Sequence, residues 1–287
     1  MSFLTEELRP VLTEMLTRVT TGIPPDILSA LKEAHVRETK DLAKKQLEAI
    51  LSSANLSHEK HLPLCQDTGL VTLFISGELI GHLEDVEAAL NKAVENLTAK
   101  GGMRANVVNP LTRKNTGTNT GLNQPEVLID RATKETTVKM ILKGAGSENF
   151  TNLKMMMPTA SRQDILKHVL QTVIEAGGKT CPPNILGIGI GGSAIQAMFN
   201  SKLALLRKVG ARNPDPELAR FEESIVKAVN ELGIGTMGLG GDTTVLDAHI
   251  EAAGTHTACL PIAISFGCWA NRVSEAQLKG EQFQIVR

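Results

Sequence analysis

The chain has 287 residues, of which 42% are hydrophobic and 21% charged, and its formal net charge is −1. This composition is typical of a globular protein and too hydrophobic for a disordered one. The balanced charge and the scarcity of aromatic residues exclude an obvious nucleic-acid-binding surface. No run is apolar for long enough to cross a bilayer, and the N-terminus does not resemble a signal peptide. We therefore expect a soluble, cytoplasmic enzyme or enzyme subunit whose four cysteines are reduced.

The first 55 residues are predicted to form helices. Apolar residues recur at intervals of three and four from Leu4 to Val19, which places them on one face of a helix. Pro24 and Pro25 interrupt this pattern and begin a second helix. A third helix with the same spacing follows.

Beyond residue 55 the pattern changes between strand and helix. Residues 70–75 form a short β-branched run bounded by glycines, as in a buried strand, and residues 84–99 return to helical spacing. The polar segment 101–125 is too long to be an idle connection in a compact domain, so a functional or disordered loop is expected. Residues 136–143 alternate as a strand does.

The second half of the chain continues this mixture. Ser161 and Asp164 form a capping-box pattern at the start of a helix that ends at Gly177. The remaining predicted elements are a strand over 185–190, a helix from there to Val209, a helix over 215–232, and strands near 243–250 and 260–266. Because strands and helices mix without strict alternation, we predict an α+β (mixed α/β) fold, a single body with mixed sheets surrounded by helices.

Three of the four cysteines, Cys65, Cys181 and Cys268, lie in loops beside glycine or proline. Their wide separation excludes a local CxxC metal site. Each of them, taken singly, has a common alternative role as a small buried hydrophobic residue. The shared loop setting favours three sulfurs directed at one ligand. Cys259 lies inside an apolar run and is interpreted as structural.

Three thiolates from three loops suit an iron–sulfur cluster, because soft thiolate ligands favour Fe–S clusters and zinc. A [4Fe–4S] cluster held by three cysteines has one iron without a protein ligand. Such an iron is a Lewis acid that can bind a substrate hydroxyl and carboxylate and make hydroxide a better leaving group.

Three glycine-rich runs have competing interpretations. The run 187–192 satisfies the G-x-G-x-x-G string of dinucleotide-binding loops, but no second strand ending in an acidic residue follows it at the required distance. Close approach of the backbone to a ligand or another element is therefore the favoured role. The runs 144–149 and 238–244 are interpreted with equal weight as anion-binding nests of backbone amides or as tight turns.

Four further features are candidates for binding or packing. Arg104 and Arg113, in the long polar loop, are able to clamp carboxylates, with ordinary solvated arginines as the alternative. His256 is a candidate for contacting a substrate carboxylate or hydroxyl, with a structural histidine as the alternative. The run Met155–Met157 is interpreted as core packing.

Seven strings occur along the chain in a fixed order: CQDTG, NVVNPLTRKNTGTNT, GAGSEN, CPPNILGIGIGG, ARNPDPEL, LGIGTMGLGGDTT and GTHTACLPIAISFGCWANR. Together they resemble the class I (iron–sulfur) fumarate hydratases in order and approximate spacing. The nearest form is the alpha subunit of the two-subunit enzymes, which is similar to the alpha subunit of L-tartrate dehydratase. The resemblance covers essentially the whole chain. It implies that residues 1–287 form one cluster-binding hydro-lyase domain, with residues 1–55 as its helical N-terminal region.

The resemblance implies an oxygen-sensitive [4Fe–4S] cluster with Cys65, Cys181 and Cys268 as its ligands. The residues that it places at the substrate are Gln66, Asp67, Arg104, Gly146 (or its neighbour Gly144) and His256. Among these, Asp67 and His256 are implied to be catalytic.

The resemblance also implies partners. In the family the remaining catalytic groups, including the proton-abstracting group and further Arg and Lys clamps, belong to a C-terminal domain or beta subunit. We therefore expect this chain to be inactive alone and to act with a beta subunit on a small dicarboxylate. The family further suggests a homodimer of the cluster-binding portion within a larger assembly.

The implied reaction is the reversible hydration of fumarate to L-malate, a step of the tricarboxylic acid cycle. The alternative is dehydration of tartrate to oxaloacetate. NPLTRKNTG and GSEN favour fumarate, whereas GCWANR is closer to the tartrate enzymes. Family fumarases carry Lys where this chain has Asp242, which argues against anion binding by that glycine turn.

Three rival interpretations belong to other classes of protein: a scaffold subunit that has lost its cluster, a nicotinamide oxidoreductase using GIGIGG, and a structural zinc protein. The three loop cysteines argue against the first. Anaerobic iron and sulfide analysis tests the scaffold, a null cofactor titration with a brown anaerobic protein excludes the oxidoreductase, and a metal group that absorbs visible light and is destroyed by oxygen excludes zinc.

Overall fold

The computed structural model describes residues 3–287, with side chains from residue 6 onward. The chain divides into two compact units, each made of segments that are discontinuous in sequence. Unit 1 comprises Met1–Pro24, Ser53–Ala145 and Arg272–Arg287, and unit 2 comprises Pro25–Ser52 and Gly146–Asn271. The α+β class with mixed sheets is confirmed, and the assignment of residues 1–287 to one functional domain stays a prediction.

The predicted N-terminal helices are present as α1 (Phe3–Thr21), α2 (Pro25–Arg37) and α3 (Asp41–Lys60). The apolar stripe of α1 is buried from Leu8 to Val19 except for the half-buried Val11, while the side chain of Leu4 lies outside the described part of the chain. Pro25 is the first residue of α2, where its missing N–H costs no helical hydrogen bond.

Unit 1 is built around a five-stranded sheet in the order β2-β1-β3-β8-β9. Its strands are β1 (Leu70–Ile75), β2 (Glu126–Ile129), β3 (Thr137–Lys143), β8 (Arg272–Lys279) and β9 (Gln282–Ile285). Only the β1–β2 pair is parallel. The 3₁₀ helix η1 (Gly77–His82) and α4 (Leu83–Ala99) follow β1, and α1 and α4 pack on the sheet to form the core of this unit.

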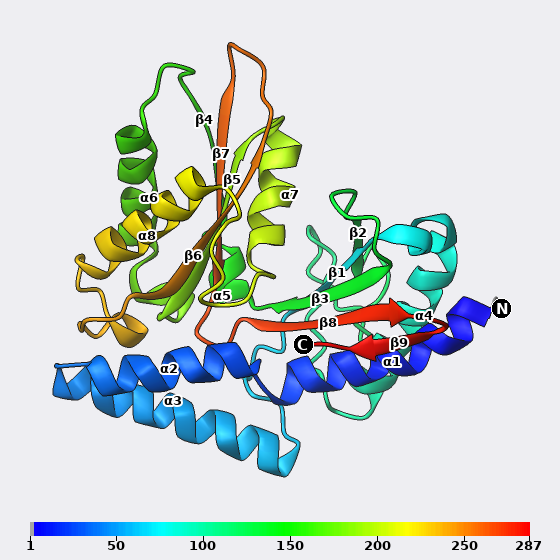
Figure 1. Ribbon diagram of the computed structural model, residues 1–287. Coiled ribbons are helices and arrows are strands. Elements are labelled where there is room, and N and C mark those ends of the chain that lie inside the picture. The colour runs from blue at the N-terminus through cyan, green and yellow to red at the C-terminus, as the bar shows by residue number, and fades with distance from the viewer. Residues whose placement is uncertain (1–2) are drawn as a thin grey trace. The chain divides into compact units, whose positions relative to one another are not determined.

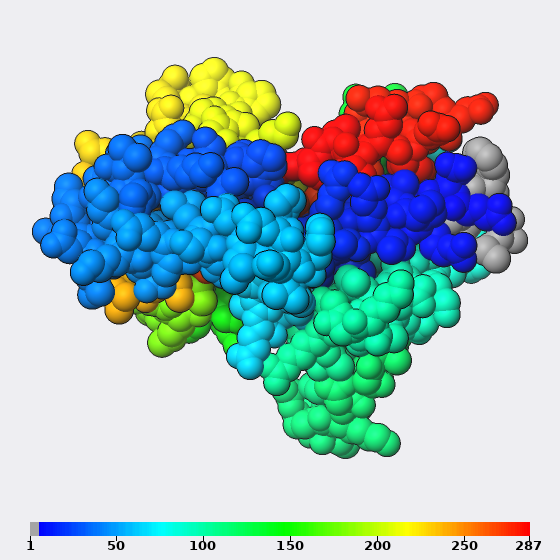
Figure 2. Space-filling model, turned by 90° about the horizontal axis from the view of Figure 1, so that it is seen from below, coloured from blue at the N-terminus to red at the C-terminus, as the bar shows by residue number. Residues whose placement is uncertain are grey.

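The long polar segment 101–125 of unit 1 is an ordered loop between α4 and β2. Isolated bridges pair Val108 with Asn115 and Gly121 with Gln124. The loop projects from unit 1 in the space-filling view, where it is green (Figure 2). Leu111 within it is 91% exposed.

Unit 2 contains a four-stranded sheet in the order β4-β7-β5-β6. Its strands are β4 (Asn152–Met156), β5 (Asn184–Gly191), β6 (Val245–Ala253) and β7 (Leu260–Gly267). Its helices are α5 (Ala145–Glu148), α6 (Arg162–Ala176), η2 (Gly177–Thr180), α7 (Ala194–Ala204), α8 (Pro216–Asn230) and η3 (Thr236–Gly238). Helices α6 and α8 lie on one side of the strands and α7 on the other (Figure 1). The sheet is therefore covered on both faces.

The glycines of the GIGIGG run serve packing. Gly187 and Gly189 lie within β5, where an added Cβ would collide with the carbonyls of Ser201 and Ala197 in α7. Their absence of a side chain lets α7 approach β5 closely, which agrees with the interpretation favoured from the sequence. These two glycines do not form a phosphate-binding loop.

The structure corrects several predicted elements. The helix expected to reach Val209 ends at Ala204, because the carboxylates of Asp26 and Asp247 accept the amides of Val209 and Gly210 instead. Strands β2, β4, β8 and β9 were not predicted. The Met155–Met157 run does not fill the core, since Met155 is 54% and Met157 72% exposed on or just after edge strand β4.

The turn containing Asp242 is held to the α2–α3 connection inside unit 2. Asp242 Oδ2 accepts the amide of Thr39 at 2.8 Å, and the Asp242 amide donates to the buried carboxylate of Glu38. The acidic residue that departs from the family pattern therefore has a structural partner. Among residues 3–287, no helix combines the length and hydropathy that crossing a membrane requires.

Candidate functional site

Unit 2 brings Cys181 and Cys268 to the same end of its sheet. Strands β5 and β7 are antiparallel with Ile185 opposite Gly267, so the turn before β5, which carries Cys181, adjoins the turn after β7, which begins with Cys268. The Trp269 amide donates to the Cys181 carbonyl at 3.0 Å. Both cysteines are half-buried, and within residues 3–287 no cysteine is in a disulfide. Two of the three predicted ligands thus come from adjoining turns.

Cys181 adopts a backbone conformation that is uncommon for a residue with a side chain. Its φ of 56° and ψ of 63° lie in the left-handed region. The conformation is fixed on both sides, because its amide donates to Gly178 and its carbonyl accepts from Trp269. Such residues cost free energy and persist where the surrounding structure determines them, often at functional sites.

Cys65 and the neighbouring predicted residues lie in unit 1, in the segment between α3 and β1. Cys65 and Gln66 are exposed. Asp67 is held by two backbone donors, with Oδ1 accepting from Gly69 at 2.9 Å and Oδ2 from Ala145 at 2.6 Å. The CQDTG motif is therefore attached to the GAGSEN motif through one carboxylate.

The two glycines of GAGSEN allow two different close approaches. A Cβ on Gly144 would lie 2.9 Å from Asp67 Oδ2 in unit 1. A Cβ on Gly146 would lie 2.9 Å from the Lys179 carbonyl in unit 2, two residues before Cys181. The sequence left open which of these two glycines contacts the substrate. In the structure, Gly144 lies next to the CQDTG motif, and Gly146 lies next to the segment that leads to Cys181.

Arg104 is attached to the CQDTG segment by its backbone. Its amide donates to Thr68 Oγ1 at 3.0 Å, and its side chain is exposed. Arg113 is also exposed, in the projecting loop, and has a positive φ of 59°. Of the two arginines, Arg104 is the one whose backbone is hydrogen-bonded to the segment of Asp67.

His256 lies at the opposite end of the unit 2 sheet from Cys268. It precedes β7, whereas Cys268 follows that eight-residue strand. At about 3.4 Å per residue the strand spans roughly 25 Å, and Figure 1 shows the connection between β6 and β7 far from the end of β7. Unit 2 therefore does not bring His256 together with Cys181 and Cys268.

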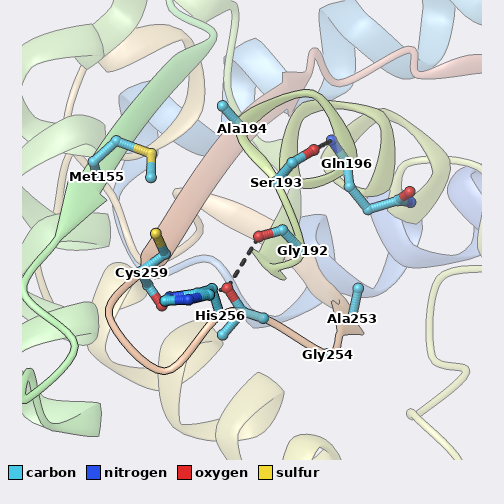
Figure 3. A pocket seen from close by; sticks show the side chains of 10 residues that line it. Met155, Gly192, Ser193, Ala194, Gln196, Ala253, Gly254, His256 and Cys259 are labelled. Atoms are coloured by element: carbon cyan, nitrogen blue, oxygen red, sulfur yellow. Dashed lines mark hydrogen bonds between the residues drawn. The ribbon is translucent and has the colours of Figure 1, made fainter.

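The His256 end of the sheet contains a pocket of about 650 Å³. It is lined by Met155, by Gly192–Ala194 and Gln196 at the start of α7, by Ala253–His256 and by Cys259. The His256 ring and the Cys259 and Met155 side chains border it in Figure 3. His256 Nδ1 accepts the Ala258 amide at 3.1 Å, so the neutral ring carries its proton on Nε2.

Sequence reasoning missed Arg272, the first residue of β8 in unit 1. Its side chain is 2% exposed, and Nε and Nη1 have no hydrogen-bond partner among the described residues. Its Nη2 and Asp67 Oδ2 both lie within 4 Å of the position that a Cβ on Gly144 would occupy. Buried donors without partners are costly, so this arginine is a candidate for binding an anion. In the sequence, the one feature that could have drawn attention to Arg272 is its position four residues after Cys268, a predicted ligand.

In the described part of the chain, no three His, Cys, Asp or Glu side chains form a preassembled metal site. Cys65 belongs to unit 1 and the other two predicted ligands to unit 2. The donor chemistry fits a cluster, because Cys181 and Cys268 offer thiol groups from adjoining, well-fixed turns and Cys65 offers an exposed one.

Comparison with known proteins identifies a matching family and relatives that share a name. The family described as "Fumarate hydratase (Fumerase)" matches residues 10–277. The putative L(+)-tartrate dehydratase subunit alpha of Methanocaldococcus jannaschii is 42% identical over 279 residues, which cover 94% of this chain and 96% of the relative. The L(+)-tartrate dehydratase subunit alpha of Escherichia coli K12 is 30% identical over 269 residues, 93% of this chain and 89% of the relative.

Proposed function

The chain belongs to the fumarate hydratase family of hydro-lyases, and from this premise we propose that it is the alpha subunit of a [4Fe–4S]-dependent enzyme acting on a four-carbon dicarboxylate. The observation that carries the proposal is the junction of Cys181 and Cys268 at one end of the unit 2 sheet. Two thiol-bearing turns from distant parts of the sequence meet there, as a shared soft-metal ligand set requires.

We propose that Cys65, Cys181 and Cys268 hold the cluster. When bound, the cluster supplies a Lewis-acidic iron that polarises the substrate hydroxyl. The chain's own contribution is to fix two of the three thiolates, those of Cys181 and Cys268, in turns whose backbones are already hydrogen-bonded. Preorganised ligands lose less conformational entropy when the metal group binds.

Asp67 is proposed to act beside the substrate. Its carboxylate accepts two backbone amides, which fix its orientation. The remaining lone pairs are available to a substrate hydroxyl or to a water molecule. Gln66, exposed next to it, supplies both an amide donor and an acceptor. Both residues are therefore suited to orienting the group that leaves or enters at C2.

Arg104 is proposed to bind a substrate carboxylate. Thr68 holds its backbone next to Asp67, and its exposed guanidinium is able to make the forked contact that carboxylates favour. In dehydration the C2–O bond breaks, and its electron pair leaves with the hydroxide. C3 loses a proton, and the electron pair of that C–H bond forms the new C2–C3 double bond. Hydration is the reverse. A cation on the carboxylate stabilises the negative charge that develops next to C3.

Two substrates are proposed because a specific observation favours each. The family description and the motifs NPLTRKNTG and GSEN favour fumarate and L-malate. The names of the two relatives favour L(+)-tartrate, as does GCWANR. L-malate and L(+)-tartrate both carry a hydroxyl on a carbon between two carboxylates, so the same residues serve either reaction.

Two kinds of partner are proposed. The relatives are named as alpha subunits, and we infer a beta subunit that carries the proton-abstracting group. We also propose a second copy of the chain, because His256 lies roughly 25 Å from Cys268 along β7. In a homodimer, the His256 Nε2–H of one copy is able to donate to the substrate held by the other.

The test of the proposed function is an anaerobic assay. The chain is reconstituted with iron and sulfide, alone and with its beta subunit, and assayed with fumarate, L-malate and L(+)-tartrate. We expect about four irons per chain and turnover only with the beta subunit. Full turnover by the chain alone would refute the two-subunit arrangement, and absence of iron uptake would refute the cluster.

The second copy is tested by complementation. As separate homo-oligomers, the Cys268→Ser variant is expected to be inactive and the His256→Ala variant to turn over about a hundredfold more slowly than the wild type. Mixed oligomers, formed by co-expression, should regain a fraction of the activity if His256 acts in the neighbouring copy's site. If both residues act within one copy, the mixture stays no faster than the His256→Ala variant.

A further inference from the structure

One buried side chain joins the turns that carry Cys181 and Cys268. Asn184 is the first residue of β5 and is 2% exposed. Its Nδ2 donates to the Thr180 carbonyl and to the Gly267 carbonyl, both at 3.0 Å. Its Oδ1 accepts the Thr180 hydroxyl at 2.8 Å.

The two carbonyls that Asn184 binds belong to the residues immediately before the two cysteines. Thr180 precedes Cys181, and Gly267 precedes Cys268. Together with the bond from the Trp269 amide to the Cys181 carbonyl, these contacts link the two turns by three hydrogen bonds. Asn184 itself is anchored, because its backbone amide donates to Thr244 at 2.9 Å.

The chemistry of the site requires an amide side chain. Two carbonyl acceptors need two donors on one group, and the Thr180 hydroxyl needs an acceptor beside them. Asn offers this combination, whereas Asp has the same shape but no donor when ionised. Because the site is buried, water is not available to replace a lost donor, and an unpaired carbonyl there is costly.

We propose that Asn184 is a positioning residue that fixes Cys181 and Cys268 relative to each other for the iron–sulfur cluster. This inference rests on the proposed function for its purpose, while the fixing of the two turns is a property of the chain itself. Residues that support metal ligands from behind tune how tightly the metal group is held.

The test compares Asn184→Asp with the wild-type chain in two measurements. The first is the alkylation rate of each cysteine by iodoacetamide in the full-length apo chain under anaerobic conditions, read by mass spectrometry. We expect Cys181 and Cys268 to react about tenfold faster in the variant, because two carbonyls lose their donors. Cys65 and Cys259 should react at the wild-type rate. The second measurement is iron retained by the reconstituted chain during incubation with a chelator, which should fall faster in the variant.

A matched control is Asn230→Asp, in the same unit. Asn230 Oδ1 accepts the amides of Thr244 and Val245, and Nδ2 donates to the Val245 carbonyl, so this side chain also supports a strand start. None of these hydrogen-bond partners of Asn230 adjoins a cysteine. It should lower stability without changing the alkylation rates or the iron retention.

A second variant keeps the test valid if Asn184→Asp fails to fold. Thr180→Val removes the hydroxyl that donates a hydrogen bond to Asn184 Oδ1 and nearly preserves the shape of the side chain. It should raise the alkylation rates of the same two cysteines by about threefold.

Unchanged rates at Cys181 and Cys268 in the folded variants, or equal acceleration in Asn230→Asp, would overturn the inference. If the wild-type chain takes up no iron, the proposed function fails, and the alkylation contrast still decides whether Asn184 fixes the two turns.

Discussion

The two ends of the unit 2 sheet are built in different ways. At the Cys181 end, the start of β5 and the end of β7 are joined by buried hydrogen bonds from Asn184 and the Trp269 amide. At the His256 end, a pocket opens between a glycine turn and the β6–β7 connection. Ile195 beside that pocket is 83% exposed, and Met155 in its wall is 54% exposed.

The difference suits the two tasks that we propose for these ends, holding a cluster and contacting a substrate. Metal ligands need fixed positions, because a loose ligand loses conformational entropy when the metal binds. A side chain offered to another molecule needs an accessible surface, and exposed apolar residues around a polar group are typical of such contacts. The same four strands therefore support a closed, preorganised end and an open one.

The largest effect is expected at the closed end. Cys268→Ser replaces a soft thiolate by a poor iron ligand, so the reconstituted chain should hold little iron and lose activity completely in complex with the beta subunit. Iron and sulfide analysis with an activity assay measures both. A Cys259→Ser variant, at the open end, is the control and should keep its cluster. A Cys268→Ser variant with full iron content and full rate would show that the ligand assignment is wrong.

The open end should lose activity without losing iron. His256→Ala removes the Nε2–H donor while leaving the cysteine turns untouched, so turnover should fall by about a hundredfold at wild-type iron content. Iron analysis and steady-state kinetics on the same sample separate the two effects. Cys259→Ala, in the wall of the same pocket, should change the rate little. Loss of iron in His256→Ala would contradict the separation of the two ends.

How far the site was predictable depends on which contacts are local. The loop positions of Cys65, Cys181 and Cys268 follow from neighbouring Gly and Pro residues, and motif resemblance adds Asp67 and His256. The meeting of Cys181 with Cys268 depends on the antiparallel pairing of β5 with β7, which no local pattern specifies. His256 stands close to Cys268 in sequence, yet the fully extended β7 between them separates the two residues in space.

The same reasoning explains the secondary structure that was missed. The helices were predictable because their apolar stripes repeat over three or more turns, as in α1, α4 and α8. Strand β8 carries Arg272, Ser274 and Gln277 among its apolar residues, and its place beside β3 comes from tertiary pairing. Strand β4 is an edge strand whose methionines face outward, so its composition suggested a core that it does not form.

A buried charge network lies near the closed end, around Asp247 at the start of β6. Asp247 accepts from Arg212 Nη1 at 2.7 Å and from the Gly210 amide at 2.6 Å, and its Oδ2 lies 3.2 Å from His249 Nε2. Burial acts to raise the pKa of Asp247, but the bonds from His249, Gly210 and Arg212 outweigh it and lower the pKa to about 2.

This lowered pKa predicts a loss of stability in acid. Because the pKa of Asp247 in the folded protein lies below the ordinary aspartate value of 3.8, the ionised carboxylate stabilises the fold above about pH 4, and the contribution is lost as pH falls toward 2. The amount is about 2 kcal/mol. The free energy of unfolding of the wild type, measured by urea titration between pH 5 and about pH 2, should fall more steeply than that of Asp247→Asn. Parallel pH dependences in the two proteins would contradict the assignment.

The smallest effect is expected at the start of helix α6, which belongs to neither of the two compared ends of the unit 2 sheet. Ser161 caps α6, accepting the Asp164 amide while the Asp164 carboxylate accepts the Ser161 amide. Ser161→Ala removes one half of this capping box and should lower the free energy of unfolding by about 1 kcal/mol. Helix α6 packs on the sheet through Ile165, Val169 and Val173, none of which adjoins a cysteine or the His256 pocket. Iron content and turnover should therefore match the wild type. A matching loss of iron would mean that cluster binding follows global stability, and the contrast between the two ends of the sheet would then have no specific cause.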